Sequence, residues 1–176
     1  MYGGLSLKLL LCVSLSGGCI GIGVLKVLEL RERLQRIRDL QELLHFIERR
    51  IAFEYQELRS ILKEAVHRGP IRYRQICSDL AEQYHVQKWR GFSELWEFHW
   101  KQEFHDQCNK EEMEILMRLG RQLGRGGPDQ QIQAMDLCTL ELERLESQAY
   151  SDFQVKGKMY SSMGVCVGIF LTVLLI

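Results

Sequence analysis

The hydrophobic and charged positions divide the chain into two apolar ends and a long mixed centre. No charged residue occurs from Leu9 to Leu25, and none occurs from Met159 to Ile176. At about 1.5 Å per helical residue, each run extends roughly 26 Å, close to the ~30 Å hydrocarbon core of a bilayer. The pattern therefore predicts one transmembrane helix at 9–28 and another at 159–176, after a short outer N-terminus at 1–8.

The first apolar run also has features of a signal peptide. A single basic residue, Lys8, precedes it, and the stretch LSGGC ending at Cys19 is similar to a lipoprotein cleavage site. However, Leu15 lies one position too far from Cys19 for that pattern, and the apolar run continues past Cys19 without a polar tether. We therefore expect this segment to be retained as a helix.

Basic residues flank the inner ends of both apolar runs. Lys26 and Arg31 follow the first run closely, and Lys156 and Lys158 precede the second. An excess of lysine and arginine marks the cytoplasmic side of a membrane protein. The pattern predicts that residues 29–158 form a cytoplasmic domain of a bacterial cell membrane protein.

Apolar residues in the central region recur at spacings of three, four or seven, which is the pattern of amphipathic helices. Gly69 and Pro70 end the first helix, and the glycine-rich segment 124–128 predicts a loop. Further helices are expected over 72–84, 93–108, 110–123 and from 129 onward. The predicted fold class is all-α, a compact helical bundle flanked by N-terminal and C-terminal transmembrane helices.

The expected core consists of large apolar residues on the inward faces of these helices. Aromatic residues recur at every fourth position of the segment 92–104, and such a stripe is usually buried because aromatic rings carry much apolar area. The predicted core includes Ile47, Ile51, Trp96, Trp100, Leu116, Leu119 and Leu123.

The titratable residues form no pattern that predicts catalysis or metal binding. His99, His105 and Cys108 lie at spacings that point to different helix faces, and the six cysteines lack metal-ligand spacing. We expect these cysteines to be unpaired thiols. With 23 basic and 23 acidic residues, the chain also has no basic footprint for nucleic acid. We predict no enzyme activity, no cofactor, no metal site and no nucleic-acid partner.

Two glycine pairs in the apolar runs are candidates for close helix packing. Gly17 with Gly21, and Gly164 with Gly168, place small residues four positions apart, and this spacing lets membrane helices approach closely. Such contacts would join helices of one chain or of two copies in a homo-oligomer. Glycine is also common in membrane helices generally, and this alternative requires no pairing.

Arginines on the first helix are candidates for binding a protein partner. Arg31, Arg38, Arg49 and Arg50 carry guanidinium groups, which pair well with carboxylates and are frequent at interfaces. Arg31 and Arg38 have a second interpretation, in which they set the topology or contact anionic lipid headgroups. Arg49 and Arg50 lie farther along the helix and are the stronger docking candidates.

Three segments occur in an order that resembles a known family. They are ERRIAFEY at 48–55, LGRQLG at 119–124 and KMYSSMGVCVG at 158–168, which runs into the apolar end. With its short first span, basic entry helix, helical domain and last span, the chain resembles the stage III sporulation protein AB family over nearly its full length. One departure is that RGGP follows the second Leu-Gly, where the family often has an acidic residue within a few positions, and Asp129 comes later.

The resemblance implies a function and a location. Proteins of this family belong to a channel complex in the mother-cell membrane around the forespore, together with a secretion-type ATPase. The domain is similar to the cytoplasmic F-domain of type II secretion platforms. We therefore expect a non-catalytic platform that docks the ATPase to the membrane assembly. A membrane signalling or regulatory protein that acts through a helical coiled-coil arm is the alternative.

Overall fold

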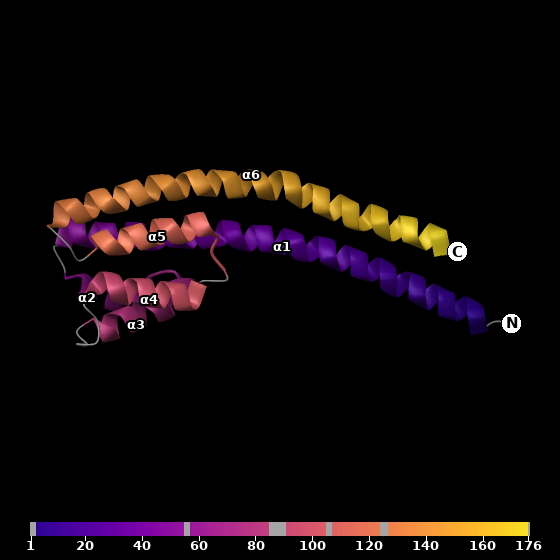
Figure 1. The fold of residues 1–176 in the computed structure, drawn as a ribbon, viewed down its shortest axis with the longest axis horizontal. Coiled ribbons are helices and arrows are strands. Elements are labelled where there is room, and N and C mark those ends of the chain that lie inside the picture. The colour runs from indigo at the N-terminus through magenta and orange to yellow at the C-terminus, as the bar shows by residue number, and fades with distance from the viewer. Residues whose placement is uncertain (1–2, 55–56, 85–90, 105–106, 124–126, 176) are drawn as a thin grey trace. The chain divides into compact units, whose positions relative to one another are not determined.

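The structure is a computed structural model of the chain, and it describes residues 3–54, 57–84, 91–104, 107–123 and 127–175. These residues are helical apart from short connections, and no strand occurs among them, so the predicted all-α class is confirmed. In chain order, the elements are α1 (Gly3–Glu54), α2 (Leu58–Arg68), the 3-10 helix η1 (Ile71–Tyr73), α3 (Arg74–Gln83), α4 (Phe92–Phe104), α5 (Lys110–Gln122) and α6 (Pro128–Leu175) (Figure 1).

The chain divides into two compact units. The terminal unit contains Met1–Leu34 and Ser147–Ile176, and the central unit contains Gln35–Glu146. Helices α1 and α6 contribute residues to both units because each helix runs past the boundary between them. The predicted domain 29–158 is somewhat longer than the central unit at both ends.

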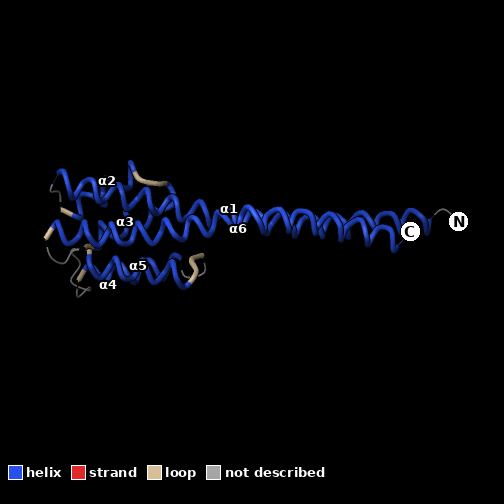
Figure 2. The backbone as a smooth tube through the Cα atoms, turned by 90° about the horizontal axis from the view of Figure 1, so that it is seen from above, coloured by secondary structure: helices blue, strands red, loops and turns tan. Residues whose placement is uncertain are grey.

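The helices of the central unit are arranged in layers. In Figure 1, α6 forms one layer, α1 and α5 lie next to it, and α2, α3 and α4 form the layer on the other side. Figure 2 shows the same unit from above, with α2 at one edge and α4 with α5 at the other. All seven predicted core residues are buried, with at most 5% of their surface exposed: Ile47, Ile51, Trp96, Trp100, Leu116, Leu119 and Leu123.

The first long helix ends earlier than the sequence predicts. The apolar periodicity suggests one helix up to Gly69, but α1 ends at Glu54 and a separate helix, α2, begins at Leu58. Arg50 and Glu64 would lie about 21 Å apart along a straight helix, yet Arg50 Nη2 lies 2.6 Å from Glu64 Oε1. The chain therefore folds back after α1, and this return buries the apolar face of α2 in the core.

An aromatic cluster joins α4 to its neighbours. The rings of Trp96, Trp100 and Phe104 on α4 stack in series, and Trp100 and Phe104 also contact Tyr73, with ring centroids 5.1–5.3 Å apart. Two polar atoms of the cluster are satisfied by backbone carbonyls. The Trp96 indole donates to the Leu116 carbonyl at 2.9 Å, and the Tyr73 hydroxyl donates to the Arg36 carbonyl at 3.0 Å.

Local capping determines where α5 begins. The Asn109 side chain accepts from the Glu112 backbone N–H at 2.8 Å, and the Glu112 carboxylate accepts from the Asn109 backbone N–H at 3.4 Å. This reciprocal capping box satisfies two backbone donors at the helix start. Helix α6 begins at Pro128, because proline has no N–H to lose and a backbone angle suited to the first helical position.

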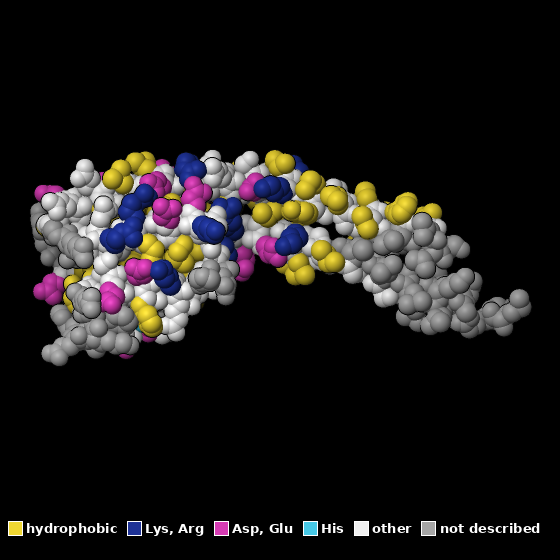
Figure 3. Space-filling view, in the orientation of Figure 1, with side chains coloured by type: hydrophobic (Ala, Val, Ile, Leu, Met, Phe, Trp, Pro, Cys, Tyr) yellow, Lys and Arg dark blue, Asp and Glu magenta, His cyan; other side chains and the backbone are white. Residues whose placement is uncertain are grey.

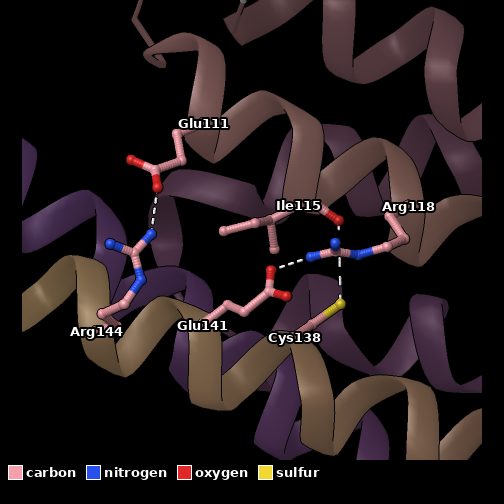
Figure 4. A network of polar contacts seen from close by, with 6 residues as sticks. All are labelled: Glu111, Ile115, Arg118, Cys138, Glu141 and Arg144. Carbon is pink, nitrogen blue, oxygen red and sulfur yellow. Dashed lines mark hydrogen bonds and ion pairs between the residues drawn. The ribbon is translucent and has the colours of Figure 1, made fainter.

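Polar contacts hold α5 against α6 at the surface. Arg144 pairs with Glu111 and Arg118 pairs with Glu141, so each pair joins the two helices (Figure 4). Beside the Arg118–Glu141 pair, the buried thiol of Cys138 lies 4.0 Å from the Ile115 carbonyl oxygen. Both pairs are solvated, so each contributes little to stability.

In the terminal unit, α1 and α6 approach closely at Gly23. A Cβ atom at Gly23 would lie 2.8 Å from the Tyr160 carbonyl oxygen and 3.6 Å from the Gly164 Cα. The predicted packing glycine Gly164 thus lies at a close approach, but its neighbour is Gly23 rather than Gly17 or Gly21, where no described atom lies within 4 Å of an added Cβ. The surroundings of Gly168 lie outside the described residues.

The two predicted transmembrane helices are not supported by the structure. Across the part of the chain that the structure describes, no helix contains an apolar stretch long enough to cross a membrane. Many side chains of both predicted spans, including those at 1–13 and 174–176, lie outside the described residues.

Candidate partner-docking surface

One face of α1 in the central unit carries a continuous polar stripe. Its members lie three or four positions apart, so that successive helical turns bring them to the same side. They are Arg38, Gln41, Glu42, His45, Glu48 and Arg49. All six residues of the stripe belong to the central unit, which begins at Gln35.

Helix α6 supplies the other wall and turns this stripe into a groove. Glu143 and Glu146 of α6 line it together with the six α1 residues, and the groove has a volume of about 590 Å³. Arg38 Nε lies 2.6 Å from Glu146 Oε1, which ties the two walls together at one point.

The groove contains more acidic than basic groups. Its side chains include four glutamates and two arginines, and His45 Nδ1 lies 3.4 Å from Glu48 Oε2. Arg49 Nε donates at 3.2 Å to the His45 carbonyl of its own helix. The Glu42 and Glu143 carboxylates make no hydrogen bond or ion pair with a described residue. Their charges, and the remaining donors of Arg49, are therefore available to a partner.

The four arginines singled out in the sequence do not form one surface. Arg38 and Arg49 both line the groove. Arg50 instead faces α2, where it pairs with Glu64, and its guanidinium carbon lies 5.4 Å from the centre of the Phe46 ring. Arg31 belongs to the terminal unit and is exposed. A role in partner binding remains a prediction for all four.

Sequence reasoning missed the acidic part of this surface. Glu42 and Glu48 could have been found from their helical spacing with Arg38 and Arg49, which places all four on one face of α1. Glu143 and Glu146 gave no such signal, because their position beside Arg38 depends on how α6 packs against α1.

The thiols of the central unit are not poised as nucleophiles. Burial raises the pKa of Cys77 to about 12 and the pKa of Cys108 to about 11, so both thiols stay protonated at neutral pH. Cys77, Cys108, Cys138 and Cys166 are free. Within the described residues, no group of three or more His, Cys, Asp or Glu side chains is placed to hold a metal ion, and His105 lies outside them.

The fold and the groove describe a helical bundle protein with a charged groove between α1 and α6. Comparison with protein families then gives a specific result, because the family stage III sporulation protein AB matches residues 8–176. The chain belongs to this family and is a sporulation-stage protein. Comparison with curated proteins and with solved structures finds no match.

Proposed function

We propose that this chain is a non-catalytic platform of a sporulation channel complex. In this role it holds a secretion-type ATPase at the mother-cell membrane that surrounds the forespore. Family membership supports the place in sporulation. The groove between α1 and α6 is the observation that carries the docking role, because it offers uncompensated charges on two helices of the central unit.

Membrane attachment is proposed for the terminal unit. Large hydrophobic side chains are exposed on the described parts of both of its helices, and Figure 3 shows a row of them along α6. On α1 and α6 these side chains include Ile22, Val24, Leu25, Leu28, Met163, Val165, Val167, Ile169, Phe170 and Val173. Exposing so much apolar area to water is costly, and a bilayer would remove the cost.

Docking of the ATPase is proposed at the groove. A partner surface that bears both signs of charge would pair its basic groups with Glu42 and Glu143 and a carboxylate with Arg49. Arg50 is excluded from this contact surface because its guanidinium group already pairs with Glu64 against α2. The proposed docking surface therefore carries charges of both signs and is not purely basic.

Charge reversal in the groove tests this docking role. The full chain is purified in detergent, and its affinity for the secretion-type ATPase of the same cell is measured by biolayer interferometry. We expect Arg49→Glu and Glu143→Lys each to weaken binding about tenfold, which corresponds to about 1.4 kcal/mol. Arg121→Glu and Glu114→Lys are the matched controls, since both residues are exposed on α5.

The controls should bind as tightly as the parent chain. If neither groove variant weakens binding while the ATPase still binds, the dock lies elsewhere on the molecule. If the purified chain binds itself or a soluble effector but no ATPase, the alternative of a signalling arm is favoured over the platform.

A further inference from the structure

The terminal unit contains a second groove, and this one is largely apolar. It lies between α1 and α6 and has a volume of about 520 Å³. Val24, Val27 and Leu28 line it from α1, and Phe153, Gln154, Gly157 and Lys158 line it from α6. The proposed docking role of the central unit makes no use of this groove.

The groove exists partly because position 157 has no side chain. Gly157 is buried, and among the described atoms a Cβ added there would meet only the Phe153 ring, at 4.0 Å. That distance is an ordinary van der Waals contact, so a larger side chain would enter the groove without colliding with the backbone. Gly157 therefore leaves free space beside the Phe153 ring, and this space is called the apolar slot below.

One uncompensated positive charge lies on the rim of this slot. Lys158 makes no ion pair with a described residue. The nearby lysines differ in this respect, since Lys156 Nζ lies 2.7 Å from Asp152 and Lys26 Nζ lies 2.7 Å from Glu29. The structure thus combines an apolar slot with a single available ammonium group.

We infer that this groove binds an anionic phospholipid, with an acyl chain in the slot and the phosphate group beside the Lys158 ammonium. The exposed apolar side chains of the terminal unit, such as Ile22 and Met163, continue the apolar surface beyond the slot, as expected for a site open to lipid. The inference rests on the membrane attachment proposed above and adds a lipid class to it.

The test measures lipid selectivity with the full chain in non-ionic detergent. Native mass spectrometry follows the binding of added phosphatidylglycerol or phosphatidylcholine. One lysine near an anionic headgroup contributes about 1 kcal/mol, so the parent should prefer phosphatidylglycerol about fivefold. Lys158→Gln should abolish this preference, whereas the matched control Lys156→Gln should keep it because Lys156 does not line the groove and already pairs with Asp152.

A second variant tests the slot itself. Gly157→Leu should weaken the binding of both lipids by filling the slot, with helix content by circular dichroism unchanged. The inference is overturned if Lys158→Gln keeps the preference, if Lys156→Gln loses it equally, or if Gly157→Leu binds lipid like the parent. A chain that forms a dimer but binds neither lipid would show that a second copy covers the groove instead.

Flotation with vesicles of phosphatidylcholine and phosphatidylglycerol separates this inference from the proposed function. If the parent floats but Lys158→Gln leaves lipid selectivity unchanged, membrane attachment stands and the lipid site is wrong. If the parent does not float, both the lipid site and the proposed attachment are wrong.

Discussion

At the residue scale, Gly120 shows how the packing of α4 on α5 depends on one missing side chain. A Cβ at Gly120 would lie 2.1 Å from Trp96 Cδ1, which is impossible unless the indole moves. The same indole donates its N–H to the Leu116 carbonyl one turn away on α5. The ring is thus held by a hydrogen bond and by the flat surface that glycine leaves.

Replacing Gly120 with alanine should destabilise the chain by about 1–3 kcal/mol or more, the usual cost of overpacking a core. The new methyl group would displace Trp96 from its hydrogen bond and from the aromatic cluster. Urea unfolding of the full chain in detergent, followed by tryptophan fluorescence, gives the change. Gly91→Ala is the control, because no described atom lies within 4 Å of a Cβ there.

The free energy of unfolding of Gly91→Ala should stay within about 0.5 kcal/mol of the parent value, as is usual for surface substitutions. An equal loss of stability at both positions would mean that contact with Trp96 does not cause the effect.

The residue scale also shows what sequence alone can supply. Burial of Trp96, Trp100 and Leu119 was predictable because helical periodicity reports which side faces the core. The importance of Gly120 was not predictable, because glycine leaves no periodic signal and its neighbour Trp96 comes from another helix.

At the element scale, the separation of α1 from α2 is the main departure from the predicted fold. Apolar residues keep their helical spacing from Leu34 to Ala65. Periodicity alone therefore cannot distinguish one long helix from a helical hairpin. The hairpin is instead defined by a tertiary contact, the Arg50–Glu64 pair, which periodicity does not report. At Gly69 and Pro70, where the sequence signal was strong, the end of the helix was predicted within two residues, because α2 ends at Arg68.

The two neighbouring arginines at the end of α1 should therefore behave differently. Arg50→Gln should lower the free energy of unfolding by about 1–2 kcal/mol, because it removes a charge-assisted hydrogen bond from a part-buried carboxylate. Arg49→Gln should change stability by less than about 0.5 kcal/mol, because its side chain bonds only to its own exposed helix. Thermal unfolding followed by circular dichroism measures both.

Comparing these two variants also tests which of the two arginines contacts α2. A chain in which Arg49→Gln is the more destabilising variant would place Arg49, and not Arg50, in the contact between α1 and α2. The hairpin described above would then be wrong in its register.

At the scale of the whole molecule, the family and the broad fold class were predictable, but the groove between α1 and α6 was predictable only in part. The order of the ERRIAFEY, LGRQLG and KMYSSMGVCVG segments suffices to indicate the family, which the family comparison confirms. The groove needs Glu143 and Glu146 beside Arg38, and that placement arises from the packing of α6 on α1. Of the four arginines predicted to bind a partner, Arg38 and Arg49 line this groove, and their role in binding stays a prediction.

We propose that this chain holds a secretion-type ATPase at a membrane. Flotation tests it most directly. Vesicles of phosphatidylcholine and phosphatidylglycerol, with or without the reconstituted full chain, are mixed with the purified ATPase and centrifuged through a density gradient. We expect the ATPase to rise with the vesicles only when the chain is present. With the double variant Arg49→Glu and Glu143→Lys, most of the ATPase should stay at the bottom of the gradient. An ATPase that stays at the bottom although the parent chain floats with the vesicles would contradict the platform role.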